Sequence, residues 1–166
     1  MRIPALLTFL FFVVLVACET PPDNVVTKAP YLETSTTYDP AFATRVGADD
    51  YGMKQYVMAF LKAGPNRDRD STEAAELQAA HMANIGRMAA EGKLILAGPF
   101  LDDGELRGIY IFNVKTIEEA RALTATDPAI KAGSLVMELK PWYGSAAMME
   151  INAMHRRLKK PKESSG

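Results

Sequence analysis

Two polar side chains of this sequence, His81 and Asp127, have the chemistry of a proton-transfer site. His81 interrupts an otherwise apolar helical stripe between Leu77 and Ile85. Imidazole titrates near neutral pH, so a partly buried ring can accept a proton and return it during a reaction. A carboxylate hydrogen-bonded to one ring nitrogen fixes the tautomer and stabilises the charged ring. Asp127 could supply that carboxylate if the second helix of the domain brings its end beside the first.

Both residues also have a purely structural interpretation. His81 could be a core histidine that is hydrogen-bonded to the backbone. Asp127 precedes Pro128, and an aspartate in that position is a good N-cap for a short helical turn. Capping a turn and orienting a histidine are compatible roles, so the sequence leaves both interpretations open.

Four further residues, Tyr56, Gly98, Pro99 and Trp142, are candidates for the wall of a substrate pocket. Gly98 and Pro99 end a predicted strand, where a missing side chain and a missing donor either shape a pocket or stop a ladder. Tyr56 and Trp142 could form an aromatic pocket together with Phe60, or they could pack in the core.

The composition argues against metal or thiol chemistry. The chain has two histidines, His81 and His155, and a single cysteine, Cys18. No pair of these residues has the spacing of metal ligands, and one cysteine cannot form a disulfide within the chain. A methionine-rich stretch near the C-terminus predicts adaptable packing and not a copper site. We therefore expect neither a metal nor another cofactor.

Cys18 lies directly behind an apolar run and predicts where the protein is located. Arg2 is followed by the almost wholly apolar segment 6–15, and small Ala17 precedes the cysteine. This is the pattern of a secretory signal, and the apolar run is too short for a permanent membrane span. The tetrapeptide Leu15-Val16-Ala17-Cys18 resembles the lipobox of bacterial lipoproteins, which implies cleavage after Ala17 and a lipid on Cys18. The alternative is an ordinary cysteine behind an ordinary signal peptide.

The chain divides into a signal, a linker, one domain, a helix and a tail. We predict a signal peptide over 1–17, a lipid-anchored flexible linker over 18–52, a domain over 53–143, a C-terminal helix over 144–158 and a basic disordered tail over 159–166. The linker is rich in proline and polar residues, although a piece around 38–46 could dock on the domain. The formal net charge of −1 points to no class of partner. A basic tail can attract anionic lipid or nucleic acid, but a solvated terminus is more common, so we expect no nucleic-acid partner.

The elements that must position His81 and Asp127 follow from periodicity and capping signals. We predict strands over 54–61, 93–100, 106–114 and 134–140, with helices over 70–91 and 117–125. The order β-α-β-β-α-β is the ferredoxin-like α+β plan, with both helices on one face of the sheet. The first strand is apolar on both sides, which predicts a homodimer that packs sheet against sheet. A stripe at helical spacing predicts that the C-terminal helix docks on the domain or on its partner (Ala147, Ile151, Met154, Leu158).

The domain resembles the YCII-related (YciI-like) family over residues 53–143. The resemblance is carried by the order and spacing of several segments: 56–58, the helix with His81, 91–100, 118–123, Thr126-Asp127-Pro128, Ala132-Gly133 and Lys140-Pro141-Trp142. It implies the dimeric α+β barrel fold. It also implies that His81 on the first helix and Asp127 before the last strand form a paired site.

This resemblance leads to one functional hypothesis and one alternative. The hypothesis is an enzyme of the cell envelope, on the periplasmic side or the exterior, that needs no cofactor. His81 would act as general base and acid on an enolisable or hydroxylated organic acid or aromatic, in an isomerisation or elimination. The alternative is a non-catalytic module that binds a small molecule or a protein.

Overall fold

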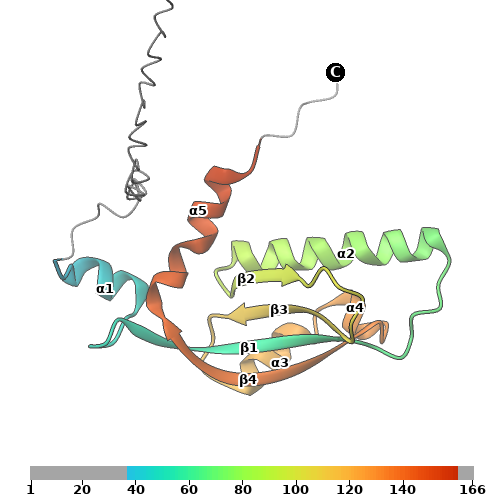
Figure 1. Ribbon diagram of the computed structural model, residues 1–166, viewed down its shortest axis with the longest axis horizontal. Helices are drawn as coiled ribbons and strands as arrows, with labels where there is room; N and C mark the ends of the chain where they lie inside the picture. The colour runs from blue at the N-terminus through green and yellow to red at the C-terminus, as the bar shows by residue number, and fades with distance from the viewer. Residues whose placement is uncertain (1–36, 161–166) are drawn as a thin grey trace, which may run out of the picture. The chain divides into compact units, whose positions relative to one another are not determined.

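A sheet of four antiparallel strands is the centre of the fold, which the computed structural model describes for residues 37–160 (Figure 1). The strands are β1 (Met53–Ala63), β2 (Leu94–Pro99), β3 (Leu106–Phe112) and β4 (Leu135–Ser145), arranged in the order β2-β3-β1-β4. Helix α2 (Ser71–Ala90) joins β1 to β2, and α3 (Ile117–Thr124) with the short α4 (Pro128–Lys131) joins β3 to β4. The predicted ferredoxin-like α+β fold is therefore confirmed.

Local capping determines where the two main helices begin. At the start of α2, Asp70 Oδ1 accepts hydrogen bonds from two backbone N–H groups of the first turn, at 2.8 and 2.9 Å. At the start of α3, Thr116 and Glu119 form the complete reciprocal capping box. Such caps stabilise a helix by about 1 kcal/mol each.

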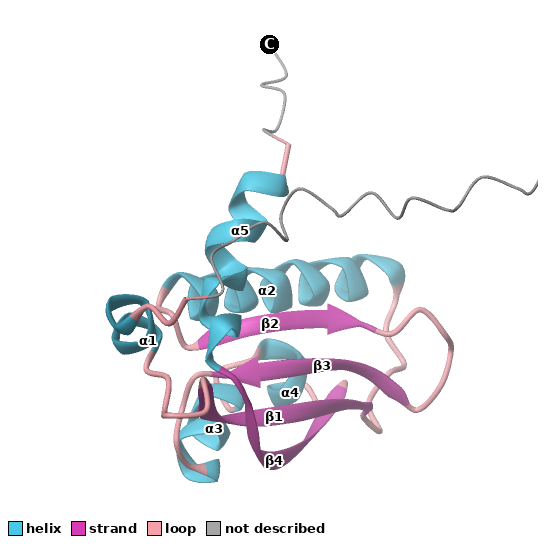
Figure 2. Cartoon of the chain, turned by 60° about the vertical axis from the view of Figure 1, so that its left-hand side comes forward, coloured by secondary structure: helices cyan, strands magenta, loops and turns pink. Residues whose placement is uncertain are grey.

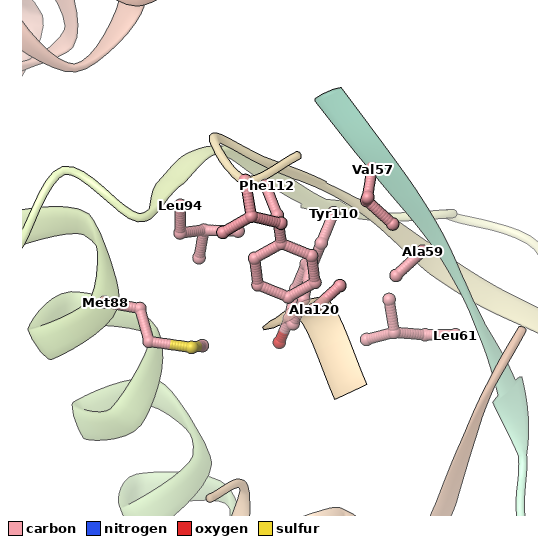
Figure 3. Packing of buried hydrophobic residues seen from close by; sticks show 9 residues of the cluster. Val57, Ala59, Leu61, Met88, Leu94, Tyr110, Phe112 and Ala120 are labelled. Carbon is pink, nitrogen blue, oxygen red and sulfur yellow. The ribbon is translucent and has the colours of Figure 1, made fainter. Parts of the chain in front are cut away.

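The main core lies between the sheet and helices α2 and α3 (Figure 3). Alternate residues of a strand point to opposite faces, so Val57, Ala59 and Leu61 of β1 face the helices. Tyr110 and Phe112 of β3 join them, and their rings pack edge to face with centroids 5.7 Å apart. The buried members of this cluster are Val57, Ala59, Leu61, Met88, Leu94, Tyr110, Phe112, Val114 and Ala120.

The opposite face of the sheet is covered in part by the chain that follows β4. A 3-10 turn, η2 (Ala146–Glu150), leads into α5 (Ile151–Leu158), and the second cluster on this face contains Tyr56, Ile95 and Ile111 packed with Ile151. Asn152 Nδ2 donates a hydrogen bond to the Leu94 carbonyl at 2.8 Å. Beyond that bond α5 projects away from the sheet (Figures 1 and 2), and its remaining apolar side chains are exposed. Of the residues in the predicted apolar stripe, Ile151 packs against the sheet, whereas Ala147, Met154 and Leu158 are exposed.

The last strand is longer than the sequence predicts. Pro141 was expected to stop it, but β4 continues to Ser145 and Pro141 is paired in register with Val57. β4 is an edge strand, with β1 on one side only. A proline lacks the backbone donor, but an edge strand tolerates it where the missing N–H would have faced solvent. The extension carries the backbone into η2.

Ordered structure also begins before Met53, within the stretch that the sequence predicts to be a linker. Helix α1 (Pro40–Val46) has Asp39 as its N-cap, and it ends at Gly47 with φ of 72°. Val46 is buried, and Arg45 forms an ion pair with Glu150 of η2 at 2.6 Å. The short piece around 38–46 thus lies against the residues that follow β4.

Candidate functional site

His81 and Asp127 lie in direct contact although they are far apart in the sequence. His81 lies in the middle of α2, and its Nδ1 is 2.9 Å from both carboxylate oxygens of Asp127. Asp127 is the N-cap of α4, and its Oδ1 also accepts a hydrogen bond from the Ala129 N–H at 2.9 Å. The carboxylate is completely buried and the histidine is 8% exposed. Asp127 therefore caps a turn and contacts the histidine at once, so the two interpretations open in the sequence coexist.

The hydrogen-bond partners define the roles of the two ring nitrogens. An ionised carboxylate can only accept, so Nδ1 of His81 carries the ring proton and its N–H donates a hydrogen bond to Asp127. Nε2 is then left with its lone pair in the neutral ring. The Tyr110 hydroxyl lies 3.3 Å from Nε2 and can donate to it. Tyr110, His81 and Asp127 thus form a hydrogen-bonded chain from β3 through α2 to the start of α4.

Tyr110 is held in its protonated form by its surroundings. Burial raises the pKa of its phenol well above the ordinary value of 10.0, and the negative charge of Asp127 raises the pKa further. A phenol that keeps its proton remains a hydrogen-bond donor at neutral pH. It can donate either to His81 or to an oxygen atom of a bound molecule.

A pocket of about 560 Å³ opens beside this chain of residues. Its lining comes from α2, the adjoining ends of β1, β2 and β3, the loop between β1 and α2, α4, the start of β4, and α5. His81 and Tyr110 lie in its wall among apolar residues that include Leu77 and Ile85. This volume is within the range of pockets that hold small organic molecules. An acid–base group in the wall of such a pocket can reach a bound molecule.

The structure brings together only part of the predicted pocket wall. Gly98 and Pro99 of β2 line the pocket with His81. Tyr56 and Trp142 lie outside this pocket and pack in the core, which is the alternative that the sequence left open. Their rings pack against each other at 5.9 Å in the cluster on the opposite face, where the Tyr56 hydroxyl donates to the Ser145 carbonyl at 3.1 Å. The reason is strand alternation, because Val57 faces the helices and its neighbour Tyr56 must face away.

Several residues of the site, His155 among them, were not predicted from the sequence. Tyr110 could have been recognised from the alternation along β3, which places its side chain on the same face as Phe112, toward α2 and His81. Arg67, Arg69 and Arg107 also line the pocket, and isolated arginines near strand ends carry no recognisable pattern. They meet at the pocket only because the ends of β1 and β3 adjoin in the sheet.

The described residues, 37–160, were also compared with the requirements of a metal site and of a membrane-spanning helix. In this part of the chain no group of three or more His, Cys, Asp or Glu side chains is arranged to hold a metal ion. The same residues include no helix with the length and apolar character needed to cross a membrane. The proposed lipidation site, Cys18, lies outside the described residues.

The free energy of unfolding should fall more steeply at alkaline pH because of Tyr110. Its pKa is higher in the folded state than in the unfolded chain, so its contribution is complete below pH 10 and is lost as the pH rises further. One such group approaches a slope of about 1.4 kcal/mol per pH unit. Urea denaturation between about pH 9 and pH 11 should show this extra slope in the wild type and its absence in Tyr110→Phe. Tyr51→Phe, at a side chain that is 87% exposed, is the control and should follow the wild type. Equal slopes in all three proteins would contradict the prediction.

The chain is a small ferredoxin-like α+β domain with a buried histidine–aspartate pair beside a pocket. The sequence model of the YCII-related domain matches residues 56–143, which is more than half of the chain. The chain therefore belongs to the YCII-related domain family.

Two relatives illustrate how far the similarity extends. The uncharacterised protein YjpA of Bacillus subtilis (strain 168) is 33% identical over 64 residues, which are 39% of this chain and 73% of YjpA. Among solved structures, 5-chloro-2-hydroxyhydroquinone dehydrochlorinase (TftG) from Burkholderia phenoliruptrix AC1100, in complex with 2,5-dihydroxybenzoquinone, matches with a TM-score of 0.40 and 20% identity. That match covers 52% of this chain and 92% of TftG. Similarity at the level of TftG says nothing about substrate or activity.

Proposed function

We propose that this protein is an acid–base enzyme of the isomerase or lyase type that uses no cofactor. Its substrate is a small hydroxylated or enolisable organic molecule bound in the pocket beside His81. The observation that carries the proposal is the buried contact of His81 Nδ1 with Asp127 at 2.9 Å, with the other side of the ring next to the pocket. Asp127 holds the ring and stabilises the charge that the ring gains, which is the role of a carboxylate behind a catalytic histidine.

The arrangement supports a reaction in two proton transfers. Nε2 of His81 removes a proton from a carbon next to a carbonyl group, or from a hydroxyl group, and the imidazolium ion pairs with Asp127. The Tyr110 hydroxyl turns from Nε2 to the oxygen that gains negative charge, since its 3.3 Å bond to the ring is longer than an ideal hydrogen bond. The imidazolium then returns the proton to another carbon, which is an isomerisation, or to a departing group, which is an elimination.

The test is a screen of organic acids and hydroxylated aromatics against the purified full chain. Thermal shift identifies molecules that stabilise the protein, and NMR then follows whether each one is converted. We expect at least one stabilising molecule to be converted by the wild type and to remain unchanged with His81→Ala. Binding without conversion, equal in both proteins, would instead support a non-catalytic binding module.

We also propose that the protein is a lipoprotein of the bacterial cell envelope. The support is the sequence alone: the apolar segment 6–15, the small Ala17 and the single Cys18. In bacteria that express the full chain, labelled palmitate should be incorporated and the protein should sediment with membranes. Cys18→Ser should abolish the label and release most of the protein from the membrane fraction. Equal labelling of both forms would exclude Cys18 as the lipidation site.

A homodimer that packs sheet against sheet is the third part of the proposal. The chain after β4 covers only one end of the outer sheet face, and Phe60, Met58 and Val136 are left partly or largely exposed there. Light scattering of the full chain should give twice the mass of one chain. Phe60→Lys places a charge in the centre of this face and should give a monomer. A wild-type mass equal to one chain would refute the dimer.

A further inference from the structure

The charged side chains around the His81 pocket are all cationic. Arg67 and Arg69 come from the loop between β1 and α2, Arg107 comes from β3, and no aspartate or glutamate is among the lining residues. The Asp127 carboxylate lies behind the ring of His81 and is not part of the wall. Within residues 37–160, none of the three guanidinium groups forms an ion pair. In the part of the chain that the structure describes, no carboxylate is therefore paired with these three charges.

The three arginines differ in how many of their donors the fold already uses. Arg69 donates to two backbone carbonyl groups, those of Asn66 and of Ala132, and so it ties the loop to the end of α4. Arg107 makes one bond, to the Gly104 carbonyl at 3.2 Å. Arg67 makes one long bond, to the Ser134 carbonyl at 3.4 Å. A guanidinium has five N–H donors, so Arg107 and Arg67 keep most of theirs for another group.

We propose that Arg107, assisted by Arg67, binds the carboxylate of the substrate, so that the pocket selects small organic carboxylates. This inference rests on the proposed function, because it names the substrate class of the same site. The planar fork of a guanidinium matches a carboxylate with two parallel hydrogen bonds. The rest of the wall carries apolar side chains, among them Leu77, Ile85 and Ala97, which suit an unsaturated or aromatic body. It also contains the polar residues Gln78, Ser134 and His155.

This placement also has a consequence for the chemistry. A carboxylate held at the arginines leaves the rest of a small molecule within the same pocket as His81 and Tyr110. Fixing one end of the substrate converts an encounter between two molecules into a reaction within one complex. Arg69 is a positioning residue, because its donors hold the loop that carries Arg67.

The experiment compares carboxylates with their neutral amides, using the full chain. The probes are benzoate, 4-hydroxybenzoate, cinnamate and crotonate, each with its amide, and inorganic phosphate as a different anion; affinities are measured by NMR titration. We expect at least one carboxylate to bind about tenfold more tightly than its amide, and more tightly than phosphate at equal ionic strength.

The variants assign that preference to a residue. Arg107→Gln should reduce the ratio of carboxylate to amide affinity to near one, and Arg107→Lys should restore only part of it. Arg121→Gln, an exposed arginine on α3 away from the pocket, is the matched control and should leave the ratio unchanged. Circular dichroism of each variant verifies that it is folded.

The outcomes separate this inference from the proposed function. Carboxylate preference that survives in His81→Ala but is lost in Arg107→Gln supports the inference, whether or not turnover is found. The inference is overturned if no carboxylate binds better than its amide, if phosphate binds as well as the carboxylates, or if Arg107→Gln and Arg121→Gln behave alike.

Discussion

Replacing His81 with alanine should lower kcat/KM by about 10²- to 10⁴-fold on whichever substrate the screen identifies. His81 is the one group whose Nε2 combines a lone pair with a buried carboxylate behind the ring, so its loss removes the base and the acid together. KM should change much less, because the arginines that bind the substrate remain. Steady-state kinetics of the full chain measure both constants.

Two further variants make this kinetic prediction specific. Asp127→Asn leaves a ring that is held less firmly and whose charge is less stabilised, so kcat should fall, but by less than in His81→Ala. Glu76→Ala, at an exposed position of α2, is the control and should keep the wild-type rate. If His81→Ala keeps more than about a third of the wild-type kcat/KM, acid–base catalysis by His81 is excluded.

Replacing Asp127 with alanine should lower the free energy of unfolding by about 3 to 5 kcal/mol. Its carboxylate is completely buried and satisfies both the His81 ring and the Ala129 N–H, so its removal leaves two buried donors without a partner. His81→Ala should cost a similar amount, because it leaves a buried carboxylate without its main partner. Urea denaturation of the full chain at neutral pH measures these differences.

The double mutant isolates the interaction between the two residues. Once either partner is gone, removing the other costs less, so the double variant should be about 2 kcal/mol more stable than the sum of the single effects predicts. The exposed pair Arg87–Glu91, at 2.8 Å on α2, is the matched control, and its coupling should stay below about 0.5 kcal/mol. If the alanine variants do not fold, the cycle is made with His81→Gln and Asp127→Asn. Additive effects within about 0.3 kcal/mol would show that the buried contact contributes nothing.

Much of the fold was predictable because its signals are local. The caps at Asp70 and Thr116 and the alternation along the strands depend only on residues a few positions apart. The errors have equally definite causes. Pro141 fails to end β4 because that strand lies at the edge of the sheet, and a strand's place in the sheet is decided by its distant partners.

Only the site residues with a distinctive side-chain chemistry or family position could be predicted from the sequence. His81 was recognisable as a histidine within an apolar helical stripe, whereas Asp127 was singled out as its partner through the resemblance to the YCII-related family. For Tyr56 and Trp142 the sequence left a pocket and core packing open, because the face on which each side chain lies depends on the alternation along β1 and β4 and on their pairing. Arg67 and Arg107 were not predicted as site residues. They come from segments far apart in the sequence, and only the pairing of β1 with β3 brings them to one pocket.

The sequence by itself determined the four strands and the two main helices, their order, and the presence of a histidine able to move a proton on the first helix. These follow from periodicity, capping and side-chain chemistry, which act over one or two turns of chain. The tertiary structure alone decided that α4 meets α2, so that a turn-capping carboxylate reaches the ring of His81. It also decided that Tyr110 completes the chain of hydrogen bonds and that arginines from two segments share one pocket. Such meetings depend on contacts between residues far apart in the chain, which packing of the whole domain brings together.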